Sequence, residues 1–136
     1  MTITFGTEGW RAVIADEFTV EHVRLVTQAI AAHVKAQGRG ASAPSVAVGY
    51  DTRFLSDRFA RAACEVLAGN RLRTVLSRTS VPTCAVSRYV VDRRLASGVM
   101  ITASHNPGIY NGIKVKEASG GSASLETVAS IERRLG

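Results

Sequence analysis

The sequence predicts an α/β fold, a three-layer α/β/α sandwich around a mainly parallel, mixed sheet. Amphipathic helical stretches alternate with short strand-like runs along the chain, and this alternation is typical of a parallel sheet with helices on both faces. The run 99–101 is wholly apolar, as in strands that are buried on both sides. Asn111-Gly112 is a turn signal, so one strand around Lys114 is expected to depart from the parallel arrangement.

Residues 1–136 are expected to form a single domain, because this length suffices to bury a core and no repeat or low-complexity segment divides the chain. Hydrophobic residues make up 46% of it, but no apolar run reaches the roughly 18 to 20 residues of a membrane span. The N-terminus carries no signal-peptide pattern. Cys64 and Cys84 fall in expected helices without metal-ligand spacing, which favours buried thiols and a cytoplasmic location.

The net charge of +6 comes mostly from arginine, which supplies 14 of the 17 basic residues. A basic chain makes nucleic acid a candidate partner. The arginines are scattered, however, with no basic run of five and no interleaved aromatic residues for base stacking. The pattern therefore favours an anionic small ligand and predicts neither a nucleic-acid nor a membrane partner.

Apolar periodicity and capping residues place the elements. Thr19, Ser56 and Ser124 are expected N-caps, because a hydroxyl oxygen accepts a hydrogen bond from an N–H in the first helical turn. Pro82 suits the first position of its helix, where no backbone N–H is needed. In order, the expected elements are an edge strand near 12–14, a helix over 19–37, a strand over 46–50, a helix over 56–69, a strand over 72–76, a helix from about 82 to 95, strands over 98–101 and 113–116, and a helix after 124.

The N-terminal segment has two interpretations. Gly6 and Gly9 bracket Thr7 and Glu8, which predicts a tight turn. Arg11 follows this turn, where it is either a fixed fork for an anion or a surface arginine on an edge strand.

Other polar residues also allow more than one interpretation. Asp51 and Arg53 follow a buried strand, at the edge where α/β proteins bind ligands. They either take part in function, or they pair locally or cap the next helix. His22 and His33 share one helix without a third ligand nearby, so we expect surface or boundary histidines rather than metal ligands.

The loop after the strand 98–101 concentrates reactive groups. Ser104 lies just past the carboxyl end of this strand, beside His105, and Lys114 follows ten residues later. A serine hydrolase is disfavoured, since the side chain of an adjacent histidine points away and no Gly-x-Ser-x-Gly elbow is present. Two possibilities remain open from the residues alone: Ser104 and Asn106 cap a turn, or Ser104 transfers a phosphoryl group with cations around it.

Four motifs resemble those of the α-D-phosphohexomutase superfamily, which includes phosphoglucomutases and phosphomannomutases. Thr-Ala-Ser-His-Asn-Pro at 102–107 is similar to the phosphoserine signature. Segments 5–11, 50–53 and 111–114 resemble the N-terminal, second-strand and lysine-bearing motifs of the same family. The match covers the family's first α/β/α domain, and domains II–IV have no counterpart in the sequence.

The resemblance implies catalytic roles for Ser104, His105, Lys114 and Arg11. Ser104 would carry a phosphoryl group and exchange it with a hexose phosphate, while His105 and Lys114 are candidates for proton transfer. Arg11 and Lys114 would offset charge on the transferred group. Together with Thr102 and Asn106, which would hold the loop, they form the expected substrate-binding set.

The resemblance also implies cofactors and partners. An oxygen of phospho-Ser104 would help to ligate Mg²⁺, whose other ligands belong to an absent domain. Hexose 1,6-bisphosphate would be the activator, and the remaining mutase domains would be the protein partner. We therefore expect no mutase turnover from residues 1–136 alone. The alternative is a stand-alone, non-catalytic domain that binds phosphate or a protein.

Overall fold

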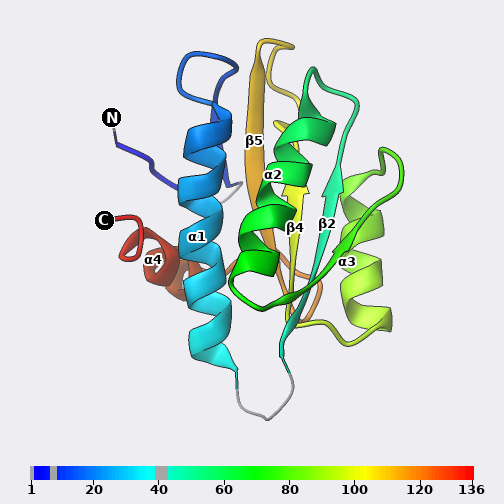
Figure 1. The fold of residues 1–136 in the computed structure, drawn as a ribbon. Coiled ribbons are helices and arrows are strands. Elements are labelled where there is room, and N and C mark those ends of the chain that lie inside the picture. The colour runs from blue at the N-terminus through cyan, green and yellow to red at the C-terminus, as the bar shows by residue number, and fades with distance from the viewer. Residues whose placement is uncertain (1, 7–8, 39–42) are drawn as a thin grey trace.

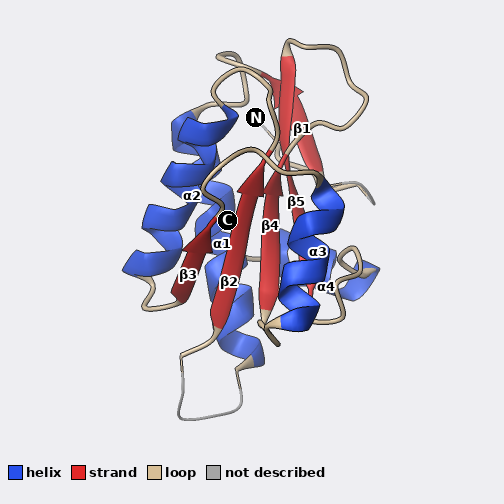
Figure 2. Ribbon diagram, turned by 90° about the vertical axis from the view of Figure 1, so that its right-hand side faces the viewer, coloured by secondary structure: helices blue, strands red, loops and turns tan. Residues whose placement is uncertain are grey.

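The computed structural model describes residues 2–6, 9–38 and 43–136, so Thr7 and Glu8 of the predicted turn lie outside the described residues. The described part contains a five-stranded sheet and four helices (Figures 1 and 2). In chain order the elements are β1 (Trp10–Val13), α1 (Val20–Gln37), β2 (Ser45–Tyr50), α2 (Ser56–Gly69), β3 (Arg73–Leu76), α3 (Thr83–Asp92), β4 (Ser97–Ile101), β5 (Tyr110–Glu117) and α4 (Leu125–Glu132). This order confirms the predicted α/β class.

The sheet has the strand order β1-β5-β4-β2-β3. β2 pairs in parallel with β3 and β4, while β5 runs antiparallel to both β4 and β1. The predicted departure of the strand around Lys114 is therefore confirmed, but its predicted cause is wrong. Asn111 and Gly112 lie inside β5, opposite Ala12 and Arg11, and the chain reverses earlier, between Ile101 and Tyr110.

Gly112 is needed for close approach rather than for a turn. A Cβ atom at this position would lie 2.6 Å from the carbonyl oxygen of Trp10 and 2.7 Å from that of Thr102. Both neighbours are backbone atoms that cannot move aside cheaply. Any side chain here would therefore push apart β1, β5 and the end of β4.

Helices cover the sheet on both faces. α1 and α2 lie in front of it in Figure 1, and α3 lies on the other face. The core beneath α1 and α2 contains Phe18, which is fully buried, stacks on Trp10 at 4.9 Å between ring centroids and meets the ring of Phe59 edge-on at 4.8 Å. Val86 and Val90 of α3 form a smaller cluster on the opposite face. The two clusters make the predicted three layers.

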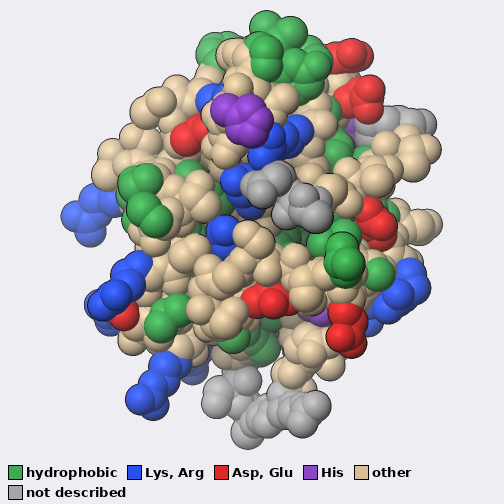
Figure 3. Space-filling model, turned by 180° about the vertical axis from the view of Figure 1, so that it is seen from behind, with side chains coloured by type: hydrophobic (Ala, Val, Ile, Leu, Met, Phe, Trp, Pro, Cys, Tyr) green, Lys and Arg blue, Asp and Glu red, His purple; other side chains and the backbone are tan. Residues whose placement is uncertain are grey.

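β5 presents basic residues on the face that α3 covers. Lys114 pairs with Met100 and Lys116 with Gly98, and partners across a ladder point to the same face. Arg11 pairs with Gly112, two residues before Lys114, so its side chain shares this face. Figure 3, which shows this side, has basic side chains in the middle of the face below a histidine.

Two predicted helix starts need correction. Ser56 is not an N-cap but the first, buried residue of α2; Leu55 takes the N-cap position with a left-handed φ of 63°. Pro82 takes the N-cap position of α3, and that helix ends at Asp92 rather than near 95. Thr19 and Ser124 are confirmed as caps, since their hydroxyl oxygens accept the N–H groups of His22 and Thr127.

The two cysteines are less buried than expected. Cys84 is exposed, so the predicted buried thiol is wrong there, because α3 presents this position to solvent. Cys64 is half-buried, and burial raises the pKa of its thiol to about 11. No helix in the described segments is both long and apolar enough to cross a bilayer.

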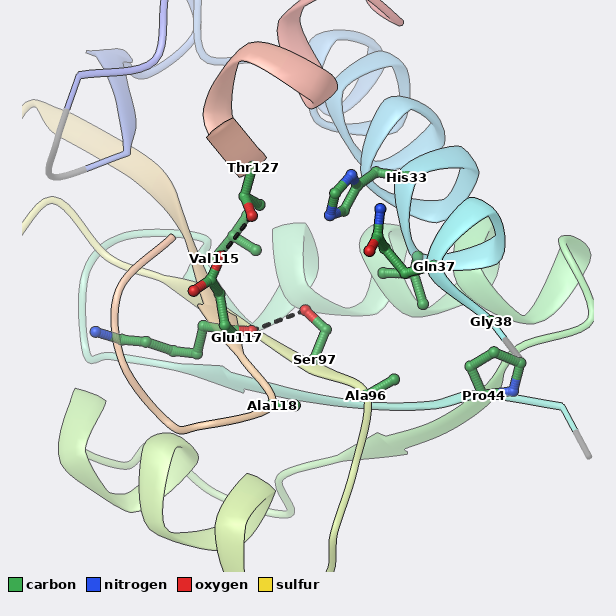
Figure 4. A pocket seen from close by; sticks show the side chains of 12 residues that line it. His33, Gln37, Gly38, Pro44, Ala96, Ser97, Val115, Glu117, Ala118 and Thr127 are labelled. Atoms are coloured by element: carbon green, nitrogen blue, oxygen red, sulfur yellow. Dashed lines mark hydrogen bonds between the residues drawn. The ribbon is translucent and has the colours of Figure 1, made fainter. Parts of the chain in front are cut away.

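His33 is not the surface or boundary residue that its helix pattern predicts. It is buried, and its Nδ1 lies 2.8 Å from Ser130 Oγ of α4. Figure 4 shows it beside a cavity of about 300 Å³, across from Glu117 and Thr127. Burial, with a further contribution from Arg134, lowers the pKa of His33 below its usual 6.5. The Thr127 hydroxyl that donates to Glu117 is the main cause of a lowered pKa of that carboxyl group.

These shifts predict a pH dependence of stability. Because the folded state lowers the His33 pKa, the unfolded chain binds a proton first as the pH falls below 6.5. The free energy of unfolding should therefore be fully retained above pH 6.5 and decrease below it, and His33→Gln should remove this part of the slope. Glu117 would add a separate loss only below its ordinary value of 4.5. Urea denaturation over this pH range measures the slopes; equal slopes in wild type and His33→Gln would contradict the prediction.

Candidate active site at the Ser104 loop

The ends of three strands meet at one edge of the sheet. β2 and β4 are parallel neighbours whose last residues, Tyr50 and Ile101, pair with each other. β5 is antiparallel and starts at this same edge, at the upper end of the sheet in Figure 1. The loop 102–109 connects β4 to β5 there. Motif segments that are far apart in the sequence are thus brought together, at the edge where α/β sheets bind ligands.

Ser104 is exposed and takes an unusual backbone conformation. Its φ of 54° is left-handed, which costs a residue with a Cβ atom about 1–2 kcal/mol. Lys114, on β5, donates from Nζ to Ser104 Oγ at 3.1 Å. The structure therefore brings the predicted serine and lysine into direct contact. This hydroxyl faces a cation instead of capping the turn.

Arg11 reaches the same loop from β1. Its Nη1 donates to Asn106 Oδ1 at 2.6 Å, so the Asn106 side chain also has a partner outside the turn. Arg11 is half-buried and shares a sheet face with Lys114. Two cations from different strands consequently flank the loop. His105 is exposed, and no hydrogen bond joins its ring to Ser104 among the described residues.

Thr102 supports the loop from below. It is buried, its Oγ1 donates to Asp51 Oδ2 at 2.6 Å, and the same oxygen accepts the N–H of Ser104 at 3.0 Å. Ser56 donates to the other oxygen of Asp51 at 2.7 Å and accepts from Asn111 Nδ2 at 2.8 Å. The Thr102 hydroxyl thus links the Ser104 N–H to the Asp51 carboxylate below the loop.

Arg53, like Asp51 beside it, belongs to this site but not to the predicted catalytic and substrate-binding sets. Its guanidinium donates to the carbonyl oxygens of Ser104, Asn106, Pro107 and Tyr110. Arg53 also lies beside Asp51, with 3.4 Å between Nε and Oδ2. This contact confirms the local pairing of the two residues, which was one of the predicted alternatives. The available signal was the position of both residues directly after β2. Nothing in their spacing pointed to a loop fifty residues away.

The implied Mg²⁺ can be compared with the oxygen ligands that the described residues offer. Mg²⁺ binds oxygen ligands, mainly carboxylates, phosphates and water. The described residues contain no group of three or more His, Cys, Asp or Glu side chains that could hold a metal ion. Asp51 is the carboxylate under the loop, and both of its oxygens accept hydrogen bonds from the protein. The expected cation would therefore need ligands from elsewhere.

The fold and the site define a class of protein. An exposed serine hydroxyl, placed at the strand ends of an α/β/α domain and flanked by lysine and arginine, is suited to hold an anionic group. The family model for the α/β/α domain I of phosphoglucomutase/phosphomannomutase matches residues 2–136. The chain belongs to this family.

Comparisons with individual proteins support this family assignment. A phosphoglucomutase of Staphylococcus aureus is 38% identical over 134 residues, which cover 94% of this chain and 23% of that protein. A Thermus thermophilus structure, assigned by its description to the phosphomannomutases, superposes with a TM-score of 0.94 and 43% identity over the whole chain and 30% of its own length. A Paramecium phosphoglucomutase with a TM-score of 0.86 and 18% identity, covering 98% of this chain and 26% of its own, shares the fold. The chain thus spans less than a third of each of these relatives.

The backbone of Ser104 generates a stability prediction. Glycine adopts a positive φ without the penalty of a Cβ atom, which outweighs its greater freedom in the unfolded chain. Ser104→Gly should therefore be about 1 kcal/mol more stable than Ser104→Ala, although both lack the hydroxyl. Urea denaturation of the two variants compares them directly. An alanine variant as stable as the glycine variant would show that the loop imposes no left-handed conformation.

Proposed function

We propose that this chain is the catalytic-serine domain of a phosphoglucomutase/phosphomannomutase-type enzyme, which transfers phosphoryl groups on hexose phosphates through phospho-Ser104. The observation that carries the proposal is the 3.1 Å contact between Lys114 Nζ and Ser104 Oγ. A phosphoryl group on serine brings about −1.5 to −2 charges near neutral pH. The ammonium group already lies where these charges would develop.

The proposed reaction is a pair of opposite transfers. In the first, the bond between phosphorus and Ser104 Oγ breaks while a bond forms from phosphorus to a hydroxyl oxygen of the hexose phosphate. The proton of that hydroxyl passes through His105 or Lys114 and ends on Ser104 Oγ. The resulting hexose 1,6-bisphosphate turns around, and the bond between its other phosphorus and the sugar oxygen breaks while a bond forms from that phosphorus to Ser104 Oγ. The Ser104 proton passes to the released sugar oxygen. The domain supplies the phosphoryl carrier for both steps.

The other residues of the site act by charge and position. Arg11 and Lys114 would stabilise negative charge on the transferred group, since cations held in advance need no reorganisation during the reaction. Asn106 holds the Arg11 guanidinium through Oδ1 at 2.6 Å. Thr102 holds the Ser104 N–H at 3.0 Å. In this proposal the side chains of Ser104, Lys114, Arg11 and His105 face the reacting group.

The remaining parts of the enzyme would come from the rest of a longer protein. The relatives above are three to four times as long as this chain, as their covered shares of 30% and 23% indicate. Sugar selection and the ligands that complete a Mg²⁺ site belong to that remainder, with an oxygen of phospho-Ser104 as this chain's own contribution. We therefore expect no net interconversion of glucose 1-phosphate and glucose 6-phosphate by residues 1–136.

Phosphorylation of Ser104 tests the carrier role. After incubation with glucose 1,6-bisphosphate, intact mass and peptide mapping should show one phosphoryl group on Ser104 in wild type and none in Ser104→Ala. Lys114→Ala should be modified roughly tenfold more slowly, equivalent to about 1.4 kcal/mol of transition-state stabilisation. Lys116→Ala is the matched control, because Lys116 lies on the same face of β5 and its Nζ reaches Ser122. An unmodified wild type, modification that survives in Ser104→Ala, or equal rates in the two lysine variants would contradict the proposal.

A further inference from the structure

The Arg53 guanidinium donates hydrogen bonds to several backbone carbonyl groups at the Ser104 loop. Nη2 donates to the carbonyl oxygens of Ser104 at 2.8 Å and Asn106 at 2.6 Å. Nη1 donates to those of Pro107 at 2.8 Å and Tyr110 at 3.0 Å. The Arg53 side chain is only 13% exposed. Three carbonyl oxygens of the loop 102–109 and that of Tyr110, the first residue of β5, therefore converge on a single half-buried cation.

Peptide geometry fixes where the opposite ends of these groups point. In a trans peptide the C=O of one residue and the N–H of the next point in opposite directions, and no cis peptide bond occurs in the described chain. Since the Ser104 carbonyl faces Arg53, the His105 N–H points away from it. The same reasoning turns the Gly108 N–H away, because the Pro107 carbonyl also faces Arg53. These two N–H groups lie on the outer side of the loop.

Charge makes this arrangement useful for an anion. Carbonyl oxygens carry partial negative charge, and four of them near a phosphoryl group would repel it. With the carbonyls drawn to Arg53, the loop offers N–H groups instead, as backbone anion sites do. The planar guanidinium has five donors in a fixed fork, whereas a lysine ammonium has three on a flexible stem. Lysine would therefore not reproduce the contact pattern.

We propose that Arg53 is the positioning residue of the Ser104 loop, and that it directs the backbone N–H groups of His105 and Gly108 toward the phosphoryl group on Ser104. This inference rests on the proposed function for the identity of the anion. Arg53 acts through the loop, because its own donors are engaged on the carbonyl side. The Asp51 carboxylate accepts a hydrogen bond from the backbone N–H of Arg53 at 3.0 Å, and this bond holds the arginine just after the end of β2.

The test compares Arg53→Lys with Arg58→Lys in the ¹⁵N-labelled chain. Arg58 is an exposed arginine near the start of α2, which makes it a matched control for the same chemical change. Without ligand, Arg53→Lys should speed hydrogen exchange at the Asn106 and Tyr110 amides, which are bonded within the loop at 3.0 Å each. With inorganic phosphate, the His105 and Gly108 amides should shift in wild type, and Arg53→Lys should bind roughly tenfold more weakly, as for loss of a charge-assisted hydrogen bond.

A second variant separates positioning from stability. Arg53→Ala should regain phosphate affinity on addition of millimolar guanidinium chloride but not of ammonium chloride, which no general loss of folding would produce. Unchanged exchange and affinity in Arg53→Lys, or the absence of guanidinium rescue, would overturn the positioning role. A third outcome is that phosphate shifts no loop amide of wild type, while Arg53→Lys still speeds hydrogen exchange in the loop. In that case Arg53 holds the loop, but the loop N–H groups do not bind phosphate, and the proposed function fails as well.

Discussion

The site depends on one carboxylate, that of Asp51. Asp51 follows β2, and its two oxygens accept hydrogen bonds from Thr102 at 2.6 Å and from Ser56 at 2.7 Å. The Arg53 guanidinium lies beside it, with 3.4 Å between Nε and Oδ2. A carboxylate that is largely removed from water needs such donors, because desolvation without them is costly. Through these hydrogen bonds the Asp51 carboxylate connects the end of β2 with the start of α2 and the end of β4.

This arrangement separates two surfaces of the loop. On the inner side, Thr102 and Arg53 bind the Ser104 N–H and the loop carbonyls. On the outer side, Lys114 contacts the Ser104 hydroxyl and Arg11 contacts Asn106. The left-handed φ of Ser104 is held by these contacts, which is how strained backbone persists at functional sites. An exposed serine hydroxyl with cations on one side is thus in place without any ligand.

The sequence predicted the features that rest on local pattern. Alternating helices and strands predicted the layered fold. The short stretch from Ser104 to Lys114 was singled out for its reactive groups, and the structure joins these two side chains at 3.1 Å. The contact between Arg11 and Asn106 spans 95 residues. The family motifs assigned both residues to one site without predicting this contact, because no local rule links the first strand of the chain to the loop between β4 and β5.

Other features depend on neighbours that no short pattern shows. Asn111-Gly112 has turn chemistry, but the close approach of Trp10 and Thr102 demands a glycine inside β5 and overrides it. His33 lies buried because α4 packs over its face of α1, and a single helix pattern does not reveal a second covering element. Arg53 looked like a local partner of Asp51, whereas its main acceptors come from the loop after β4.

We propose that the Asp51 carboxylate organises the anion site of the Ser104 loop without itself touching the anion. The most direct test is an amide-resolved phosphate titration of Asp51→Asn beside wild type. Simple Coulomb attraction predicts tighter phosphate binding once a negative charge is removed. The structure predicts the opposite: phosphate binds more weakly at the Ser104 and His105 amides, because Thr102 and Arg53 lose the anchor that orders the loop. An Asp51→Asn variant that binds phosphate as tightly as wild type, or more tightly, would contradict this role of Asp51.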